Sequence, residues 1–541
     1  MSTPDSLEKL FPTVDEIPAR YRMEVQLEQR DYLLNGELLQ WQGNVAPIKS
    51  PVCLSTESGL EQVTLGYSPL MDSNAALKAL DAATQAYSQG CGTWPSMAVA
   101  ERIQHVEDFL QHMRSKREEV VKLLMWEIGK SLKDSEKEFD RTCDYIVDTI
   151  NALKELDRSS SRFEIEQGTL AQIRRLSLGV VLCMGPYNYP LNETFTTLIP
   201  ALIMGNTVIF KPAKFGVLLM TPLLEAFQQS FPKGVINIIY GRGRDTIPCL
   251  MSSGKIDIFA FIGTNKAASD LKKLHPKPHR LRAVLGLDAK NPGIILPDVD
   301  LDNAVSECVA GALSFNGQRC TALKIIFVPE NKKDDFISKF DAAISELKPG
   351  MPWSEGVNLT PLPEPGKTEY LQALVDDAIA LGSSVVNQDG GTTKETYFHP
   401  AVLYPVSPNS RIYREEQFGP VIPVVPYKDI SEVIDYVLNS NYGQQLSIFG
   451  NNSKDVATLI DTFSHQVGRI NLNSQCQRGP DIFPFNGRKN SAEGTLSVSD
   501  ALRVFSIRSV VATKHTDRGK SLIGDIIRDR DSSFLSTDFI F

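Results

Sequence analysis

One of the eight cysteines of this chain has surroundings that suit a chemical role. Cys320 lies in the segment 314–322, which reads SFNGQRCTA, with an arginine directly before it. A cysteine acts as a nucleophile in its thiolate form, and a neighbouring cation favours that form. A free cysteine is more often a small buried residue without a chemical role, but this polar, glycine-containing segment favours a reactive thiol. The sequence therefore predicts that Cys320 is a nucleophile.

A second candidate follows the apolar run 178–184, which is typical of a short buried strand. The next residues, 185–190, read GPYNYP, and Asn188 is the amide at their centre. Ligands of open α/β sheets collect at the carboxyl ends of strands, where an amide can donate a hydrogen bond to a developing oxyanion. The alternative is an asparagine that shapes a proline-bounded turn. On its own the segment leaves both interpretations open.

The elements that would position these residues fall into a helical part and an alternating part. Apolar residues recur at three- and four-residue spacing within 75–156, which predicts helices. From residue 178 onward, short apolar runs alternate with helical patterns. The expected strands are 178–184, 207–211, 235–240, 257–262 and 281–285, and the expected helices between them include 193–204 and 217–231. This alternation predicts an α/β fold, with a parallel sheet covered by helices on both faces.

A second alternating region extends from about residue 293 to 472. Its expected strands are 323–328, 421–425 and 468–472, and the proline- and glycine-rich stretch 348–366 is expected to be a loop. The charged tail 515–541 ends in apolar residues, and the sequence leaves open whether it docks on a neighbour or is disordered. A chain of 541 residues is long enough for two or three domains.

The composition argues against several classes of function. The net charge is −9 and no basic stripe is present, which disfavours nucleic-acid binding. No apolar run reaches the roughly 18 residues of a membrane span, and residues 1–18 do not have the pattern of a secretion signal. The cysteines form no CxxC pair, so no metal site is expected. We expect a cytoplasmic protein without nucleic-acid or membrane partners.

The cysteine segment closely resembles the catalytic-cysteine segment of the aldehyde dehydrogenase superfamily. Its QRCTA part is similar to one branch, the NADP-dependent non-phosphorylating glyceraldehyde-3-phosphate dehydrogenases. The resemblance covers roughly residues 30–514, with the motifs in family order. It implies that Cys320 attacks an aldehyde carbonyl while Asn188 and the Cys320 backbone N–H hold the oxyanion. Hydride transfer would leave a thioester, and water would release the acid.

The resemblance also implies the coenzyme NADP, with NAD as the alternative. The segment 211–214, KPAK, resembles the one that grips the adenosine ribose, where Lys211 would contact the ribose hydroxyls. Lys214 stands where NAD-preferring members often carry a glutamate, and a lysine there suits the 2′-phosphate of NADP. A solvated lysine pair at a strand end is the alternative.

Two further segments resemble coenzyme-binding parts of the family. The segment 261–268, FIGTNKAA, resembles the pyrophosphate loop, in which Gly263 and Thr264 begin a helix whose N–H groups face phosphate. The segment 415–421, EEQFGPV, resembles the one in which Glu416 holds the nicotinamide ribose and Phe418 packs nearby. A bare glutamate pair would otherwise be a solvated turn.

The favoured substrate within this resemblance is glyceraldehyde 3-phosphate. In that branch arginines and a tyrosine hold the phosphate, and the matching residues here are Arg141, Tyr189, Arg319 and Arg478. Guanidinium groups suit bidentate binding of phosphate, which gives this set a physical logic. For Arg141 a solvated position on its helix is a comparable alternative.

The resemblance fails at the general base. The family carries a glutamate in an ELGGK string, whereas the segment 285–292 here reads LGLDAKNP and places Gly286 at that position. Asp288 is two residues on, and in an extended segment such residues share a face. One hypothesis is that Asp288 substitutes as base. Slow deacylation, transfer of the acyl group to coenzyme A, and a coenzyme-binding relative that has lost turnover are the alternatives.

The resemblance also implies the domain organisation. It predicts a Rossmann-type coenzyme domain from 1–156 and 179–290, an α/β catalytic domain from 291–479, and a β oligomerisation arm from 157–178 and 480–514, followed by the tail 515–541. Dimers or tetramers are usual in the family, so a homodimer or homotetramer is expected.

Overall fold

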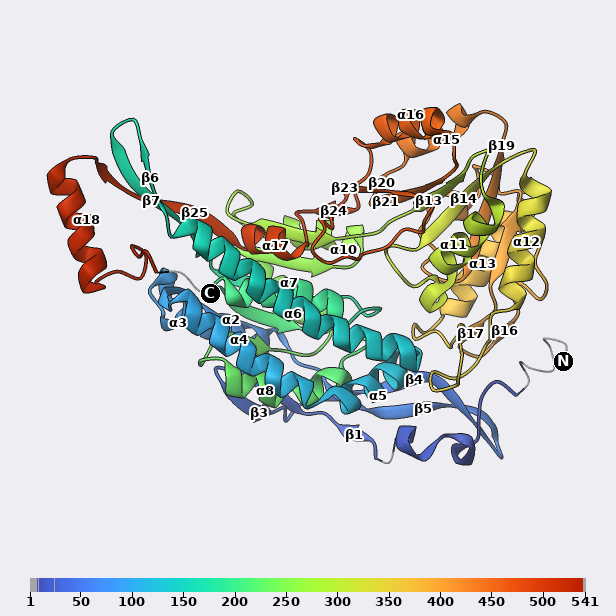
Figure 1. Ribbon diagram of the computed structural model, residues 1–541. Coiled ribbons are helices and arrows are strands. Elements are labelled where there is room, and N and C mark those ends of the chain that lie inside the picture. Colours follow the sequence, from blue (N-terminus) through green and yellow to red (C-terminus); the bar gives the residue numbers. More distant parts are fainter. Residues whose placement is uncertain (1–6, 8, 24, 539–541) are drawn as a thin grey trace.

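Two sheets and their helices form the body of the computed structural model, and a third, narrow sheet projects from one end (Figure 1). The structure describes residues 7, 9–23 and 25–538. Among the described residues, no helix combines the length and the apolar character that crossing a membrane requires.

The first sheet has eight strands, and its five central strands are parallel. In spatial order they are β24 (Ala492–Glu493), β12 (Arg282–Gly286), β11 (Ile258–Ile262), β8 (Val180–Met184), β9 (Thr207–Lys211), β10 (Ile236–Ile238), β2 (Asp31–Leu34) and β3 (Glu37–Gln40). The central strands are largely buried and rich in Val, Ile and Phe, as is typical of strands covered on both faces. The predicted parallel sheet is confirmed, and the antiparallel strands β24, β2 and β3 are additions at its edges.

Two groups of helices cover this sheet. The helices α7 (Asn192–Ile203) and α8 (Leu224–Ser230), which follow β8 and β9, contact α4 (Val99–Arg114), and α7 also contacts α6 (Leu132–Ser160). The helix α9 (Gly243–Ser252), which follows β10, contacts α2 (Ser73–Tyr87) and α10 (Asn265–Lys273). The chain reverses its direction across the sheet after β10, so right-handed crossovers place the two groups on opposite faces.

The expected helix 217–231 is interrupted. A 3₁₀ segment, η4 (Leu218–Leu223), precedes α8, and Pro222 lies within it. Proline lacks the N–H that an α-helix needs and clashes with the preceding turn, which accounts for the irregular start. The helix α5 (Arg117–Ile128) lies within 75–156, where the sequence predicts helices.

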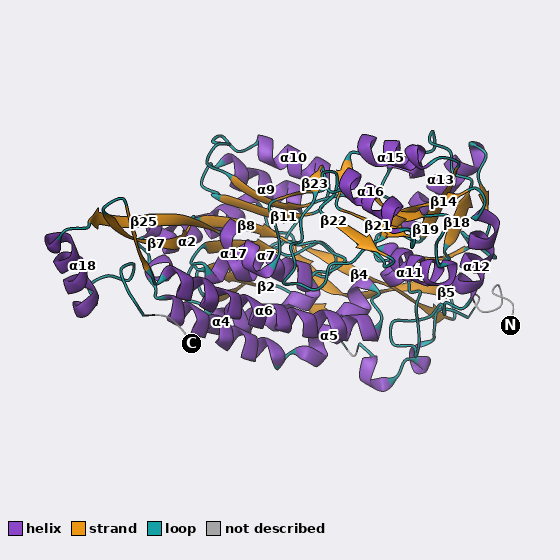
Figure 2. Cartoon of the chain, turned by 45° about the horizontal axis from the view of Figure 1, so that its top comes forward, coloured by secondary structure: helices purple, strands orange, loops and turns teal. Residues whose placement is uncertain are grey.

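The second sheet lies beside the first and has seven strands. In order they are β15 (Ser384–Val385), β18 (Ala401–Tyr404), β19 (Val421–Tyr427), β14 (Leu323–Pro329), β13 (Asn291–Ile295), β21 (Gln445–Phe449) and β22 (Arg469–Leu472). All pairs except β15–β18 are parallel. A hydrophobic core lies on each face, under the helices α11 (Leu301–Leu313), α12 (Lys333–Ser345), α13 (Lys367–Ala380), α15 (Ile430–Asn439) and α16 (Ser453–Phe463). Figure 2 shows these helices around the strands.

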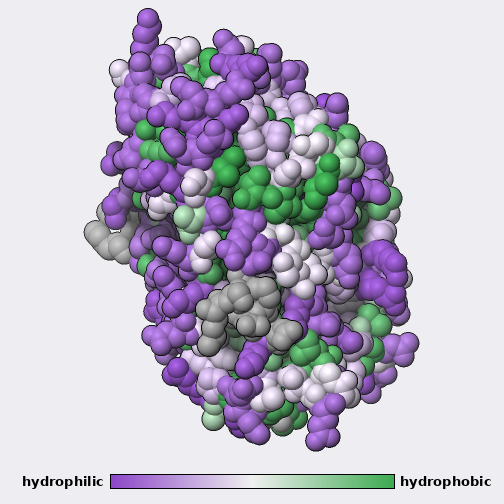
Figure 3. Space-filling view, turned by 90° about the vertical axis from the view of Figure 1, so that its right-hand side faces the viewer, coloured by the Kyte–Doolittle hydropathy of each residue, from purple (hydrophilic) through white to green (hydrophobic). Residues whose placement is uncertain are grey.

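The projecting sheet is antiparallel and consists of β25 (Ser506–Lys514), β7 (Thr169–Ser177) and β6 (Phe163–Glu166). Exposed apolar side chains lie along it, including Leu176, Ile507 and Val510. Beyond it the chain forms α18 (Asp517–Asp529) and then returns, so that the carbonyl of Ser536 accepts hydrogen bonds from Gln172 and Arg174. At the opposite end, in Figure 3, hydrophobic residues form small groups among hydrophilic ones.

Strands near the N-terminus were not anticipated from the sequence. A second small sheet contains β1 (Leu27–Glu28), β5 (Gly59–Pro69) and β4 (Val45–Thr56), and the long pair β4–β5 packs against α5. The segment 348–366 contains no helix or named strand, in agreement with the expected loop.

Candidate active site

Cys320 lies in a tight loop between α11 and β14. The segment η5 (Ser314–Gly317) precedes it, and three successive residues, Phe315, Asn316 and Gly317, have φ values of 51°, 54° and 71°. Left-handed backbone is strained for residues with a side chain, and such strain is typical of functional loops. The amide of Asn316 holds the turn by bonding Thr360 at 3.0 and 3.1 Å.

Cys320 is partly buried at the cavity wall, and this burial raises the pKa of its thiol to about 11. The charge of Glu193 raises the pKa further, and the charges of Lys324 and Arg478 lower it. The neighbouring Arg319 does not act in this way, because its guanidinium donates to the carbonyls of Ala310 and Gly311 at the end of α11. The cations that favour the thiolate are therefore Lys324, in the following strand, and Arg478.

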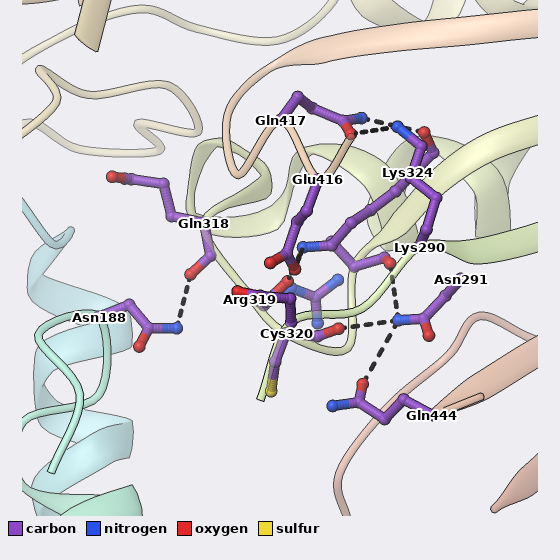
Figure 4. A network of polar contacts seen from close by, with 12 residues as sticks. Asn188, Lys290, Asn291, Gln318, Arg319, Cys320, Lys324, Glu416, Gln417 and Gln444 are labelled. Atoms are coloured by element: carbon purple, nitrogen blue, oxygen red, sulfur yellow. Dashed lines mark hydrogen bonds and ion pairs between the residues drawn. The ribbon is translucent and has the colours of Figure 1, made fainter. Parts of the chain in front are cut away.

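Lys324 is a buried cation at the start of β14, with 1% of its side chain exposed. Its Nζ donates to Glu416 at 2.5 Å and to the carbonyl of Arg319 at 2.8 Å, directly before the cysteine (Figure 4). It thus anchors the backbone of the cysteine loop and supplies positive charge. Sequence reasoning missed this residue, although a lysine in the otherwise apolar run 323–329 was a visible signal.

Asn188 approaches the cysteine loop from the first sheet. It follows β8, is 5% exposed, and its Nδ2 donates to the carbonyl of Gln318 at 2.8 Å (Figure 4). The structure therefore brings together the amide and the thiol that the sequence singled out separately. An amide has two N–H donors, so one remains for a ligand.

A buried ion pair holds the Asn188 segment in place. Lys130 pairs with Glu138 of α6, and Lys130 Nζ also donates to the carbonyl of Asn188 at 2.8 Å. Glu138 accepts the backbone N–H groups of Leu191 and Asn192 at 3.0 and 3.2 Å. Removal of one partner from a buried ion pair leaves an uncompensated charge. Both members of this clamp, Lys130 and Glu138, are therefore needed to hold the segment. No pattern in the sequence indicated it.

A cavity of about 630 Å³ opens beside Cys320. Nine of the predicted site residues line it: Asn188, Lys211, Lys214, Gly263, Thr264, Asp288, Cys320, Glu416 and Phe418. They come from the ends of β8, β9, β11 and β12 and from the second sheet. The cavity therefore lies at the carboxyl edge of the parallel strands, between the two sheets.

At one end of this cavity, Lys211 is 7% exposed and donates to the carbonyl of Pro212 at 3.0 Å. An ammonium has three N–H donors, so others can serve a ligand. Lys214 is exposed, and its Nζ lies 5.0 Å from the centre of the Phe215 ring. Thr264 caps α10, with its Oγ1 accepting the N–H of Ala267 at 3.3 Å.

Asp288 lies at this same end of the cavity. Its carboxylate accepts the backbone N–H of Asn265, the first residue of α10, at 2.9 Å. Gly286, two residues earlier, also lines the cavity, and a side chain built there would begin in ordinary contact with Ile262, 3.4 Å away. The space for a longer residue at Gly286 therefore exists.

Glu416 and Phe418 form the wall from the second sheet. Burial raises the pKa of the Glu416 carboxyl, and Lys324 opposes that rise. Phe418 has a φ of 45°, and its ring lies 4.6 Å from Lys324 Nζ and 5.9 Å from the Tyr187 ring. Glu416 and Phe418 therefore face one cavity, and the buried Lys324 contacts both of them.

The four residues predicted to hold a phosphate lie outside this lining. Arg141 forms a bidentate pair with Asp481 at 2.8 and 2.6 Å. Arg478 lies 3.5 Å from the same carboxylate and 3.2 Å from Glu193. The structure thus joins two of the predicted arginines through one aspartate.

The tyrosine of this set lies between charged groups. Lys130 Nζ lies 3.6 Å from the centre of the Tyr189 ring, and the charges of Arg319 and Arg141 both act on its hydroxyl. Arg478 is buried, and its Nη1 has no hydrogen-bond partner among the described residues. A buried N–H without a protein partner normally meets water or a ligand.

Glu193 is a cavity residue that sequence reasoning missed. It lies in the first turn of α7, is 6% exposed, and lines the cavity together with Cys320. Burial raises the pKa of its carboxyl, while Arg478 and Arg141 lower it. The signal was a glutamate within the apolar helical run 193–204. Within the described residues, no group of three or more potential ligand side chains is placed to hold a metal ion.

A change of pH is expected to alter coenzyme affinity through Lys211. Burial lowers the pKa of this lysine to about 8. Lys211 is therefore mostly a charged ammonium below pH 8 and mostly neutral above it. Binding of an anionic nucleotide should weaken by about tenfold per pH unit from pH 8 upward. Titration of NADP binding between pH 7 and 10 checks this. In Lys211→Arg the charge persists, so the same dependence in that variant would contradict the assignment.

Comparison with known proteins gives matches over most of the chain. The family model described as aldehyde dehydrogenase family matches residues 54–511. An NADP-dependent glyceraldehyde-3-phosphate dehydrogenase of Streptococcus equinus is 30% identical over 432 residues, covering 78% of this chain and 87% of that protein. Malonate-semialdehyde dehydrogenase 1 of Bacillus thuringiensis is 28% identical, covering 83% of this chain and 92% of that protein.

A solved structure matches at the level of the fold. The NADP-dependent glyceraldehyde-3-phosphate dehydrogenase of Bacillus halodurans, complexed with NADP, has a TM-score of 0.82 and 29% identity, and the match covers 91% of this chain and all of that one. The two-sheet arrangement described above is therefore that of a known fold.

Proposed function

The chain belongs to the aldehyde dehydrogenase family, and on that premise we propose that it oxidises an aldehyde to its carboxylic acid with NADP through a thioester on Cys320. The favoured substrate is glyceraldehyde 3-phosphate, which would give 3-phosphoglycerate. The observation that carries the proposal is the single cavity that holds Cys320, Asn188 and the lysines at the end of β9.

The cavity suits a phosphorylated dinucleotide. Lys211 has unused N–H donors in a buried position, Lys214 adds an exposed positive charge, and the capped N-terminus of α10 adjoins them. Glu416 on the opposite wall offers a carboxylate to ribose hydroxyls. When bound, the coenzyme would supply the hydride acceptor for the oxidation.

The chain's own residues account for formation of the acyl group. Cys320 Sγ would attack the aldehyde carbonyl, and Lys324 would stabilise the thiolate from which the attack proceeds. The free N–H of Asn188 and the backbone N–H of Cys320 would hold the resulting oxyanion. Hydrolysis of the thioester would then release the acid and restore the thiol.

The phosphate of the substrate is proposed to bind at the arginine cluster. Arg478 carries an unpartnered buried N–H and shares Asp481 with Arg141. The charges of Arg141 and Arg319 both act on Tyr189. The relative from Streptococcus equinus, named for glyceraldehyde 3-phosphate, supports this choice, and the similarly close malonate-semialdehyde dehydrogenase keeps other aldehydes as alternatives.

Steady-state kinetics with matched aldehydes would test the substrate. Glyceraldehyde 3-phosphate and unphosphorylated glyceraldehyde are compared with NADP and without added phosphate. We expect kcat/KM to favour the phosphorylated aldehyde by about 10²-fold or more, since charge-assisted bonds to a guanidinium are each worth about 1.5–3 kcal/mol. Equal values would contradict the phosphate site. Acyl release that requires added coenzyme A would favour the acyltransferring alternative.

Coenzyme choice is expected to depend on Lys214. In Lys214→Glu a carboxylate would face the 2′-phosphate, so NADP affinity should fall by about 10- to 100-fold, or roughly 1–3 kcal/mol, with a much smaller effect on NAD. Fluorescence titration with each coenzyme measures this. Lys214→Gln is the matched control, with an intermediate loss expected. A parallel loss for NAD and NADP would contradict the assignment.

We also propose that the projecting sheet is the oligomerisation arm of a cytoplasmic homodimer or homotetramer. The exposed apolar residues on β7 and β25 support this, because a water-exposed apolar strip favours association. Sedimentation as a monomer at micromolar concentration would contradict it.

A further inference from the structure

Five carboxylates line the cavity beside Cys320. Four of them, all except Glu193, have partners that suit other tasks. Glu364 accepts from Tyr187 and pairs with Lys367 at 3.0 Å each. Glu415 is bound bidentately by Arg411 and is largely exposed. The remaining three are Asp288, Glu416 and Glu193.

Asp288 and Glu416 belong to the coenzyme end of the cavity. Asp288 is bonded to the first amide of α10, and its charge acts on Glu416 and Tyr442. Glu416 is held by Lys324 on the wall assigned to the coenzyme ribose. Neither carboxylate is free to move toward the thiol without losing these partners.

Glu193 is different because it lines the cavity together with Cys320 and comes from α7, a helix that packs on the first sheet. Among charged groups, it has the strongest influence on the Cys320 thiol. It also lies in the same cavity wall as Asn188, five residues earlier, whose amide bonds the cysteine loop. The clamp of Lys130 and Glu138 fixes the start of α7. Glu193 is therefore held near the reacting sulfur by rigid elements.

The partner of Glu193 suits a proton acceptor. Arg478 Nε lies 3.2 Å from Glu193 Oε1, in a pair of which both side chains are less than a tenth exposed. The charge of Arg478 lowers the pKa of the Glu193 carboxyl and so opposes the rise that burial causes. The amide of the adjacent Asn192, 1% exposed, is unpartnered within the described part of the chain. Buried polar atoms of this kind commonly bind ordered water.

We propose that Glu193 is the general base that activates the water for hydrolysis of the Cys320 thioester, an inference that rests on the proposed dehydrogenase function. It fills the role that Gly286, which has no carboxylate, cannot perform. It does so from α7 rather than from β12, and it competes with the hypothesis that Asp288 is the base.

The step balances as follows in atoms and electrons. Glu193 takes one proton from water as the water oxygen bonds to the acyl carbon, and the carbonyl oxygen becomes an oxyanion. The oxyanion then reforms the carbonyl, the carbon–sulfur bond breaks, and its electron pair leaves with Cys320 Sγ. The proton on Glu193 passes to the sulfur. Thioester and water thus become carboxylic acid and thiol, with no change of oxidation state.

Rapid mixing of full-length Glu193→Gln with glyceraldehyde 3-phosphate and NADP tests the proposal. We expect a pre-steady-state burst of NADPH as in the wild type, followed by steady-state turnover lower by about 10²–10⁴-fold, the usual contribution of a general base. Added hydroxylamine should restore turnover, because it attacks a thioester without that base. Glu119→Gln, at an exposed glutamate of α5 outside the cavity lining, is the matched control and should retain the wild-type steady-state rate. Asp288→Asn is measured beside it, because it tests the competing base.

A pH profile gives a second readout that a merely structural residue would not affect. In the wild type, steady-state kcat should fall on the acid side as Glu193 is protonated, and this limb should disappear in Glu193→Gln. The burst of Glu193→Gln shows that the variant is folded, and Glu193→Asp, which keeps the carboxylate, should recover part of the rate.

Three results would overturn the proposal: a wild-type steady-state rate in Glu193→Gln, an equal loss of burst and turnover in it, or a loss of turnover confined to Asp288→Asn. Failure of the proposed function itself is distinguishable, because the wild type would then give no burst with this aldehyde.

Discussion

Cys320→Ala is expected to lose aldehyde oxidation by on the order of 10⁶-fold, which is the cost of removing the nucleophile from an enzyme of covalent catalysis. Cys320 lines the cavity, Asn188 is bonded to its loop, and the charge of Lys324 acts on its thiol. Among the described residues that line the cavity there is no other cysteine and no serine. NADPH formation, followed by absorbance, measures the loss, and NADP binding should persist because the coenzyme end of the cavity is unchanged.

Cys91→Ser is the control for this prediction, because Cys91 is an exposed cysteine far from the cavity lining. It should retain the wild-type rate. Turnover in Cys320→Ala within tenfold of the wild type, or a comparable loss in Cys91→Ser, would show that the chemistry does not pass through Cys320.

Asn188→Ala is expected to lower kcat by about 10²–10³-fold, the usual cost of losing one oxyanion donor. The amide is preorganised, since one N–H is bonded to Gln318 at 2.8 Å and the backbone is held by Lys130. The loss should appear in the burst rate and leave KM nearly unchanged, because the donor acts on charge that develops during the attack.

Asn188→Asp is the matched variant, because it keeps the size of the side chain and removes the donors. It should be at least as slow as alanine. A wild-type burst rate in either variant would contradict the oxyanion role, and a lost burst together with a lowered melting temperature would point to the fold instead.

The sequence predicted the central features of the site because each is carried by a local segment. Cys320 and Asn188 lie in short segments whose residue types favour turns. Ligands of parallel sheets bind at the carboxyl ends of the strands, so the position of Asn188 after a strand was informative. The alternating runs from 178 to 285 predicted the central strands of the first sheet, and the structure confirms that sheet. The family resemblance is confirmed as well.

The electrostatics of the site could not be predicted in the same way. The charge that lowers the thiol pKa comes from Lys324, and the orientation of Asn188 depends on Lys130 and Glu138, far away in sequence. Glu193 shares a cavity with Cys320 because α7 begins at that cavity, after the loop that follows β8. Burial and pairing of such groups are properties of the tertiary structure. They cannot be predicted from the residue pattern of a single sequence.

The strands near the N-terminus were missed for a different reason. The strands β4 and β5 have irregular burial, and register shifts occur between them. Strict alternation is the signal by which a half-buried strand is found, and a bulged pair weakens it. The interrupted helix before α8, in contrast, carried a visible signal in Pro222.

The most direct test of the account is to trap the acyl group. Wild-type protein is mixed with glyceraldehyde 3-phosphate and NADP without added phosphate, quenched in acid within the burst, and analysed by mass spectrometry beside the NADPH formed. The account predicts close to one NADPH per active site and a 3-phosphoglyceroyl group on the peptide that contains Cys320. NADPH without an acyl adduct, or an adduct on another residue, would contradict it.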